Sequence, residues 1–478
     1  MVQNDSLDPD DWDAFRRLSH QALDAALDDL IGLREHPVWR ETPPEVLARL
    51  DDAAPVEGVG LRQVLGEFAR DIKPFGVGNR HPAFFGWAHG AGTPVGMVAE
   101  LLAGGLNLNC GGRNHVGIAL EQKIAAAMAE KFGFPATASG LFVAGASQAN
   151  LHGVLIARRA ALGAGVRERG VGDARLRAYA STQAHGCVAQ AMDLSGLGTQ
   201  ALRQIPCDAQ GRMRLDFLRE AIAADRAEGA RPFLLVGTAG TVNFGAFDPL
   251  EDLADIAARE NLWLHVDGAF GALTIFSEKL KGLTAGMSRA NSLAFDFHKW
   301  AHVPYDAGFV LVRDRQAQRD AFAAPAAYLS RTKTGLAKGE DWPCDLGPDL
   351  SRGFRALKVW MTLRAYGLRR LGENMERNCA DARRLAQLID GSEEFERVAP
   401  VPLNIVCFRL KHAPDEANRA LVEHLHGAGV AAPSLTRLDG RTAMRCALFN
   451  HRTGTADVEA FFAEARERAR ACSQVSEC

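Results

Sequence analysis

Apolar positions near the start of the chain recur with a helical period. The segment 11–33 places apolar side chains three or four residues apart, and Pro43-Pro44 marks the start of another helix. These helices have little apolar sequence with which to form a core of their own. We therefore predict a helical N-terminal arm over residues 1–80, which packs on another domain or on a partner subunit.

Between residues 140 and 312, short apolar runs alternate with helical patterns. Strands that alternate with helices of about 10–15 residues are typical of βαβ units and of a mostly parallel sheet covered on both faces. Such a sheet binds ligands at the carboxyl ends of its strands. The runs predicted to be strands are 141–143, 177–180, 202–205, 233–237, 262–266, 292–297 and 309–312.

The pattern changes after residue 354, where helices predominate. We predict a large α/β domain over 81–354 and a small α+β domain over 355–478. In the small domain we expect two separate helices at 355–366 and 375–388, and a charged, solvated helix at 456–471. The other elements expected there are a helix at 415–425 and strands at 405–410 and 443–448.

Composition narrows the class of protein. The 478 residues are 47% hydrophobic and 24% charged with a formal net charge of -3, which gives no sign of a nucleic-acid partner. The acidic N-terminus is unlike a targeting signal, and no apolar run approaches the roughly 20 residues of a membrane span. Nine cysteines form no Cys-x-x-Cys pair. We expect a cytoplasmic protein without a membrane partner, a disulfide framework or a metal site.

Lys299 is the first candidate for chemistry, on the turn between the predicted strands 292–297 and 309–312. Burial and cationic neighbours lower the pKa of such a lysine and leave a neutral amine that condenses with carbonyl groups. Most lysines near a strand end are solvated surface charges instead. The assignment therefore depends on partners elsewhere in the chain.

Four such partners follow other predicted strands. Asp267 would hold a pyridine nitrogen or cap the next segment, and Gly145-Ala146-Ser147 would bind a phosphate or cap a helix. His185 would stack on a flat ring or serve as a structural histidine, and the loop 238–241 is by itself only a turn. Together with Lys299 they match the set of groups that binds pyridoxal phosphate.

Eight motifs then connect the chain to a known family. They occur in the family's order over most of the chain: HPAFFGW at 81–87, LEQKIAAAMAEKFGFP at 120–135, GLFVAGASQANLHGVLIARR at 140–159, AHGCVAQAMDLSGLG at 184–198, GTAGTVNFGAFDP at 237–249, HVDGAFGA at 265–272, DFHKWAHVPYDAG at 296–308 and SRGFRALKVWMTLRAYG at 351–367. The chain resembles the group II pyridoxal-phosphate-dependent decarboxylases, the family of aromatic-L-amino-acid, histidine and glutamate decarboxylases. This resemblance implies fold type I, the aspartate-aminotransferase-like α/β fold.

The resemblance also implies which residues bind pyridoxal 5′-phosphate. Lys299 would form the Schiff base, Asp267 would pair with the ring nitrogen, and His185 would stack on the ring. The remaining contacts to the cofactor or substrate would come from Ala146, Ser147, Thr241 and His298.

The implied activity is decarboxylation of an L-amino acid to the amine and CO2. The enzyme would be a homodimer whose N-terminal arm wraps the partner and whose active sites lie at the subunit interface. Tyr328 aligns with a mobile-loop tyrosine that returns a proton to the substrate carbon, and related aldehyde synthases typically have phenylalanine there. Aldehyde synthase, carbon–carbon lyase and aminotransferase activities stay open. A non-catalytic, pyridoxal-phosphate-binding regulator is disfavoured by the complete set of Lys299, Asp267 and Tyr328.

Two departures from the family's pattern concern the cofactor and the substrate. The segment 296–299 reads Asp-Phe-His-Lys where many relatives have Asn-Pro-His-Lys, and its aspartate is assigned no phosphate contact. Trp87, His89, Asn109 and Arg113 are expected in the substrate pocket, in loops more polar than those of the aromatic amino acid enzymes. We therefore expect a more polar or acidic substrate, with Arg113 either pairing with its side-chain carboxylate or serving as a structural residue of the dimer interface.

Overall fold

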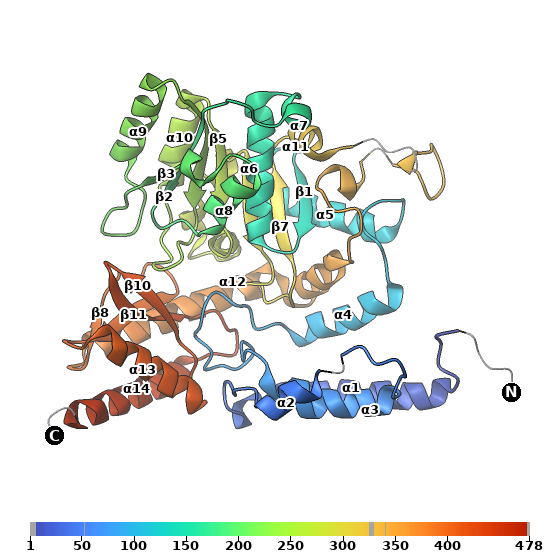
Figure 1. Ribbon diagram of the computed structural model, residues 1–478, viewed down its shortest axis with the longest axis vertical. Coiled ribbons are helices and arrows are strands. Elements are labelled where there is room, and N and C mark those ends of the chain that lie inside the picture. Colours follow the sequence, from blue (N-terminus) through green and yellow to red (C-terminus); the bar gives the residue numbers. More distant parts are fainter. Residues whose placement is uncertain (1–5, 52, 325–328, 340, 476–478) are drawn as a thin grey trace.

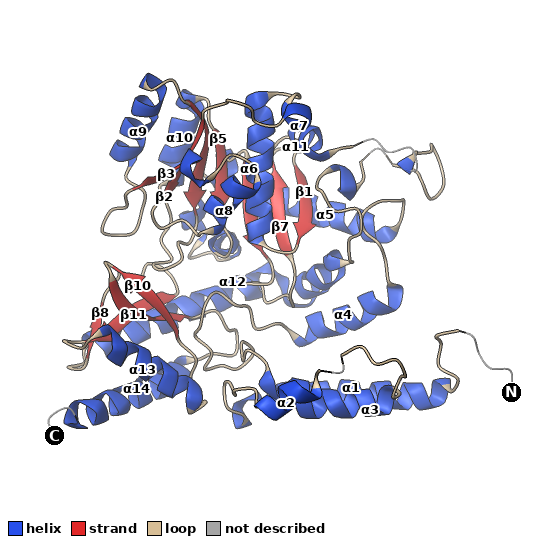
Figure 2. Cartoon of the chain, in the orientation of Figure 1, coloured by secondary structure: helices blue, strands red, loops and turns tan. Residues whose placement is uncertain are grey.

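The computed structural model describes residues 6–51, 53–324, 329–339 and 341–475. A seven-stranded sheet flanked by helices forms one end of the molecule, and a smaller sheet with two helices lies beside it at the other (Figures 1 and 2). The first helices run along the edge of the molecule next to α4 (Figure 1).

The N-terminal arm is helical, as predicted. It comprises α1 (Trp12–Ile31), α2 (Pro44–Arg49) and α3 (Leu61–Glu67), followed by α4 (Pro94–Leu106). The Asp11 side chain caps α1 by accepting hydrogen bonds from the N–H groups of Asp13 and Ala14. No residue of α1 is buried, and Trp12 and Ile31 are 58% and 83% exposed. The apolar side chains of this helix are therefore only partly covered in the single chain.

The large sheet has the order β1-β7-β6-β5-β4-β2-β3. The five strands β2 to β6 all run parallel to one another. Strand β7 runs antiparallel to both of its neighbours, β1 and β6. The mostly parallel sheet predicted from the sequence is thus confirmed. Its strands are β1 (Ser139–Val143), β2 (Leu176–Ser181), β3 (Leu202–Ile205), β4 (Arg231–Thr238), β5 (Trp263–Asp267), β6 (Ser292–Asp296) and β7 (Gly308–Val312).

Apolar residues on both faces of the strands build two cores. In β4, the Leu235 side chain joins one core while Leu234 and Val236 join the other, because neighbouring residues of a strand point to opposite faces. Helix α6 packs on the face of Leu234, and α9 and α10 pack on the other. The helices around the sheet are α5 (Val116–Lys131), α6 (Ala146–Leu162), α7 (Val166–Arg169), α8 (Cys187–Leu194), α9 (Leu215–Ala227), α10 (Leu250–Glu260) and α11 (Arg315–Phe322).

The smaller sheet is antiparallel, with the order β10-β11-β9-β8. Two of its strands, β8 and β10, were not predicted, because they are short and partly exposed. Helix α12 contributes buried side chains to this core and to the core of the large sheet. The elements of this part are α12 (Arg355–Asp390), β8 (Phe395–Arg397), β9 (Ile405–Leu410), α13 (Asp415–Gly427), β10 (Ser434–Leu438), β11 (Arg441–Ala447) and α14 (Thr455–Val475).

Two helices were predicted at 355–366 and 375–388, and the chain forms two helices that meet within α12 at a kink at Gly367. The φ of 71° at this residue is not helical and is accessible because glycine has no Cβ. Another prediction for this part of the chain was wrong. The helix expected to be solvated, α14, buries Val458, Phe461 and Phe462 in the small core. Its charged residues cover only the outer face, so the helix is amphipathic.

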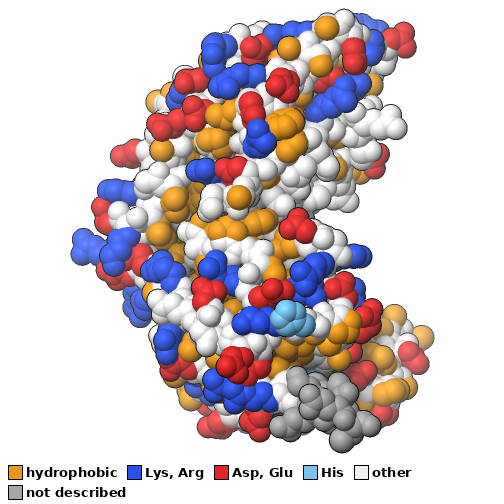
Figure 3. Space-filling view, turned by 90° about the vertical axis from the view of Figure 1, so that its left-hand side faces the viewer, with side chains coloured by type: hydrophobic (Ala, Val, Ile, Leu, Met, Phe, Trp, Pro, Cys, Tyr) orange, Lys and Arg blue, Asp and Glu red, His pale blue; other side chains and the backbone are white. Residues whose placement is uncertain are grey.

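None of the helices in the described ranges is long and apolar enough to cross a membrane. On the face shown in Figure 3, basic and acidic side chains are interspersed around smaller apolar patches.

Candidate active site

A cavity of about 620 Å³ lies at the carboxyl ends of the parallel strands. Strands β4, β5 and β6 contribute Thr238, Asp267 and Asp296 to its wall, and the small sheet contributes Thr436 and Arg445 from the opposite side. The position agrees with the rule that parallel sheets bind ligands where their strands end.

Buried neighbours fix the turn that carries Lys299. Phe297 and Trp300 are fully buried, and Trp300 donates a hydrogen bond from Nε1 to Asn378 Oδ1 at 2.9 Å. A Cβ on Gly90 would lie only 2.0 Å from the carbonyl oxygen of His298, so glycine is needed for the loop to approach this turn. The lysine is thereby held facing the cavity.

The Lys299 amine forms an ion pair with Asp296, with 3.0 Å between Nζ and Oδ2. Burial alone lowers the pKa of this lysine, but the charge and hydrogen bond of Asp296 outweigh it, so the net shift is upward. The expectation of a lowered pKa was therefore wrong for the free protein. Its neighbours are anionic, not cationic.

His298 lies beside this pair as a neutral imidazole. Its Nδ1 accepts a hydrogen bond from the N–H of Ala307 at 2.9 Å, so the neutral ring carries its proton on Nε2. Nε2 faces Asp296 Oδ2 at 3.6 Å. Burial lowers the pKa of His298 to about 4, against the opposing charge of Asp296.

Asp267 and His185, two further residues predicted from the sequence, also line the cavity. Asp267 is buried at the end of β5, where its Oδ1 accepts a hydrogen bond from the N–H of Ala269 at 3.1 Å. Burial raises its pKa, although the Lys299 charge opposes the shift. His185 Nδ1 accepts a hydrogen bond from the N–H of Cys187, which orients the ring at the cavity wall.

The start of α6 lines the same cavity. Ala146 and Ser147 line it, and Gly145 precedes them as an N-cap residue without a side-chain hydrogen bond. The first N–H groups of a helix have no partner within the helix and carry its positive end, which suits a phosphate. A Cβ on Gly308 would lie 2.4 Å from Gly145 Cα, so a glycine in β7 is required for this close packing.

The predicted substrate residues fall in two places. Trp87 and His89 line the cavity, with 5.8 Å between their ring centroids in a stacked arrangement, and Tyr305 lies edge-on to His89. Asn109 lies outside it, where its Oδ1 accepts hydrogen bonds from the N–H groups of Gly111 and Arg352.

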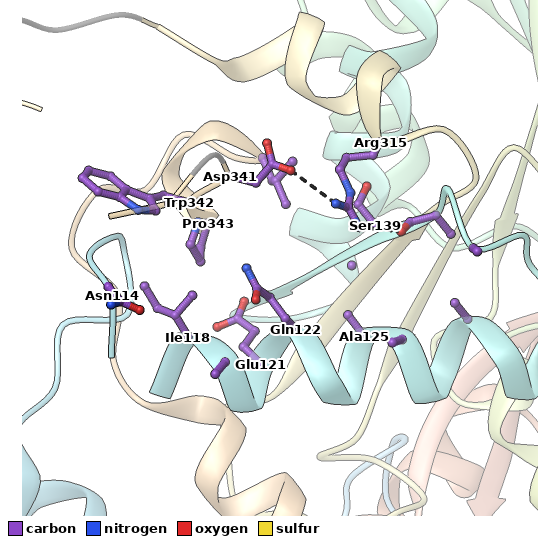
Figure 4. A pocket seen from close by; sticks show the side chains of 18 of the residues that line it. Asn114, Ile118, Glu121, Gln122, Ala125, Ser139, Arg315, Asp341, Trp342 and Pro343 are labelled. Atoms are coloured by element: carbon purple, nitrogen blue, oxygen red, sulfur yellow. Dashed lines mark hydrogen bonds and ion pairs between the residues drawn. The ribbon is translucent and has the colours of Figure 1, made fainter. Parts of the chain in front are cut away.

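Arg113 lines a second, larger cavity of about 760 Å³. Figure 4 shows that cavity, with Ile118, Glu121 and Gln122 on one side and Trp342 on the other. The Arg113 guanidinium lies 5.0 Å above the Trp342 ring. The second cavity contains none of the strand-end residues of the first, so we place the active site in the first although it is smaller.

Thr241 is not among the residues that line the active-site cavity. It is fully buried in the turn after β4, where its Oγ1 accepts a hydrogen bond from the N–H of Ala246 at 3.0 Å. The remaining predicted residue, Tyr328, lies outside the described residues.

Thr238, Tyr305 and Arg445 are among the residues of the cavity wall that sequence reasoning missed. Thr238 opens the loop in which Thr241 was chosen, and within the described chain its buried hydroxyl has no hydrogen-bond partner. Arg445 donates a hydrogen bond from Nε to the carbonyl oxygen of Val242 at 2.9 Å. It comes from β11, far along the chain, so no local pattern pointed to it.

Comparison with known proteins identifies a matching family model, described as the pyridoxal-dependent decarboxylase conserved domain, over residues 43–411. An aromatic-L-amino-acid decarboxylase of Bacillus atrophaeus is 31% identical over 459 residues, 93% of each chain. An L-2,4-diaminobutyrate decarboxylase of Rhizobium meliloti (strain 1021) is 30% identical over 93% of this chain and 89% of that protein. A phenylacetaldehyde synthase of Arabidopsis thaliana is 28% identical, over 92% and 93%.

Solved structures show the same fold. A crystal structure described as Oryza sativa TDC with PLP and tryptamine superposes with a TM-score of 0.89 at 25% identity. The match covers 98% of this chain and all of that one. The likeness therefore extends over both sheets and the N-terminal helices.

The state of His298 gives a pH-dependent prediction. Because its pKa falls from 6.5 to about 4 on folding, the unfolded chain binds more protons between these values. The stabilisation that the neutral His298 contributes to the free energy of unfolding is therefore complete above pH 6.5. It is lost as the pH falls toward 4, by about 3 kcal/mol. Urea unfolding of the cofactor-free protein at both ends of this window should show a smaller loss for His298→Gln than for wild type.

The matched control for this measurement is His20→Gln, on the exposed surface of α1. This variant should lose as much unfolding free energy between pH 6.5 and pH 4 as the wild type does. Equal losses for His298→Gln and wild type would contradict the assignment of a neutral His298.

Proposed function

Because the chain belongs to the pyridoxal-dependent decarboxylase family, we propose that it removes the carboxylate of an L-amino acid and releases CO2 and the corresponding amine. The protein is a carboxy-lyase, and its cofactor is pyridoxal 5′-phosphate. The observation that carries the proposal is the meeting of Lys299 and Asp267 in one cavity with the start of α6.

The residues of the cavity fit each end of this cofactor. The uncapped start of α6 suits the phosphate, and the buried Asp267 suits a cationic ring nitrogen. Lys299 is an amine that faces the same space, and the His185 ring lies at the wall. A further buried acceptor, Asp296 Oδ1, has no hydrogen-bond partner among the described residues.

Pyridoxal phosphate supplies an aldehyde that condenses with amines and a ring that withdraws electrons from the substrate. The chain's own residues hold and polarise it. Lys299 would anchor it covalently, and Asp267 would keep the ring nitrogen protonated, because an anion in a low-dielectric site stabilises a neighbouring cation. His298, Ala146 and Ser147 would contact the phosphate.

On the substrate side, Arg445 would bind the carboxylate. Its guanidinium is buried at the cavity wall opposite the strand ends, and guanidinium groups recognise carboxylates through paired hydrogen bonds. Trp87, His89 and Tyr305 would form the wall against the substrate side chain. The choice between an aromatic and an acidic substrate then depends on whether Arg113 of a second subunit reaches this wall.

An aldehyde synthase activity is the second candidate, because a phenylacetaldehyde synthase is among the relatives. Tyr328 distinguishes the two reactions. As a proton donor to the substrate carbon it would direct the reaction to the amine.

The proposal is tested by incubating the recombinant protein with pyridoxal phosphate and a panel of aromatic, acidic and basic L-amino acids. We expect CO2 and the matching amine in equal amounts from one class. Lys299→Ala should release no CO2, and Arg445→Lys should raise KM because the paired contact to the carboxylate is lost. With dissolved O2 as the oxidant, Tyr328→Phe should shift the product toward aldehyde and ammonia.

Either of two results would contradict the proposal. Aldehyde and ammonia from the wild-type protein would establish the synthase reaction instead. Cofactor-loaded protein that releases no CO2 from any member of the panel would favour a lyase or transaminase.

We further propose a homodimer with active sites shared between subunits. The exposed Trp12, Phe15 and Ile31 of α1 support an interface, as do Leu101, Leu102 and Leu106 on α4, each more than a third exposed. Arg113 and Asn109 lie outside the cavity of their own chain, so they would act on the cavity of the partner. Sharing of this kind makes the two chains complement each other.

Mixed dimers test this arrangement. Arg113→Met should lose activity toward an acidic substrate, and mixing it with Lys299→Ala should restore activity, because one of the two sites then receives both intact residues. Mixing Asp267→Asn with Lys299→Ala is the control and should restore nothing, since both residues line the cavity of one chain. Full activity of Arg113→Met alone, or no recovery in the mixture, would contradict the shared site.

A further inference from the structure

Asp296 is an acidic residue at the phosphate end of the cavity. It ends β6, is buried, and faces Lys299 Nζ through Oδ2 at 3.0 Å. Its second oxygen, Oδ1, points toward the start of α6: a Cβ on Gly145 would lie 3.9 Å from this oxygen and 3.7 Å from His298 Cε1. Among the described residues, Oδ1 has no hydrogen-bond partner.

A phosphate at the start of α6 would therefore lie next to this carboxylate. A phosphate monoester carries a charge between about -1.5 and -2 at neutral pH. Two anions in a buried site repel each other, and the repulsion is relieved when one of them binds a proton. The uncapped helix would stabilise the phosphate charge, which leaves the carboxylate as the group to be neutralised.

Other ionisable groups face the same place. Lys299 and His298 belong to the same segment as Asp296, Tyr305 lies on the following turn, and Asp267 lies on the neighbouring strand β5. The charges of Asp306 and Lys358 also act on His298. The first turn of α6, Ala146 to Gln148, brings no ionisable side chain. Lys299 is thus the one cation in direct contact with Asp296 among the described residues.

We propose that Asp296 couples cofactor loading to proton binding. In the free protein its carboxylate pairs with the Lys299 ammonium. On loading, the N–H bond of the ammonium breaks and an O–H bond forms on Asp296, across the 3.0 Å contact. The neutral amine is then free to condense with an aldehyde, with loss of one water molecule, and the neutral carboxyl group no longer repels the phosphate.

This inference rests on the cofactor site and not on the decarboxylation reaction. According to the proposal, Asp296 keeps the proton from Lys299 when the ligand carries a phosphate. When the ligand has no phosphate, that proton is released to solvent. Pyridoxal, which has the same aldehyde and ring but no phosphate, is therefore the matched ligand. Effects of Lys299 on condensation are common to both ligands and cancel in the ratio of their affinities.

The test is titration of the full-length, cofactor-free protein with pyridoxal phosphate and with pyridoxal between about pH 7 and pH 9, above the second phosphate pKa of about 6. For wild type, the ratio of the two affinities should fall as the pH rises, by up to about tenfold per pH unit, because one proton is linked to phosphate binding. For Asp296→Asn the ratio should stay constant.

Asp306→Asn is the control variant, since Asp306 acts on His298 by its charge, is paired with Arg355 and is not among the residues that line the cavity. It should keep the wild-type slope. A constant ratio in wild type, or the same slope in Asp296→Asn as in wild type, would overturn the proposal.

A second measurement needs no variant. Calorimetric titration of wild type in two buffers of different ionisation enthalpy counts the protons exchanged on loading. Pyridoxal phosphate should retain about one more proton per site than pyridoxal, and equal counts would overturn the proposal. Neither titration contains an amino acid, so failure of the decarboxylation experiment and failure of this one are distinguishable.

Discussion

The buried contact between Lys299 and Asp296 connects the chemistry of the cavity to the fold. Asp296 ends β6, and Lys299 lies in the connection from β6 to the reversed strand β7. The fully buried Phe297 and Trp300 hold this connection in place. In so apolar a setting an isolated charge is unstable, so the ammonium and the carboxylate stabilise each other. Any ligand that uses the lysine must first break this pair.

The rest of the site follows from parallel strands that end at one edge of the sheet. Asp267 ends β5, and Thr238 ends β4, one strand further from Lys299. Residues far apart in the chain are therefore neighbours at the cavity. The small sheet closes the cavity with Arg445, which explains why the helical and antiparallel part of the chain is needed for a site built on the large sheet.

Local sequence patterns were sufficient for the large sheet, because its strands are short apolar runs separated by amphipathic helices. They were also sufficient for Lys299, Asp267, Ser147 and His185 as members of one cavity, since each follows a strand of the same sheet. Local patterns failed where contacts between distant segments decide which residues are buried. The apolar face of α14 is buried only because the small domain covers it.

The partners of individual side chains could not be predicted from the sequence either. The partner of Lys299 is the aspartate three residues before it, and no spacing rule indicates that this ion pair outweighs the effect of burial on the lysine. Arg113 illustrates the reverse case: its loop resembles a substrate loop, yet in the single chain its guanidinium packs on Trp342. Such contacts are set by residues more than 200 positions away.

The central claim is that Lys299 is the residue to which the cofactor is attached. Borohydride reduction of the loaded protein, followed by proteolysis and mass mapping, makes that attachment permanent and locates it. The structure predicts the pyridoxyl phosphate mass on the peptide that contains Lys299. The same mass on a peptide with another lysine, such as the buried Lys358, would contradict the claim.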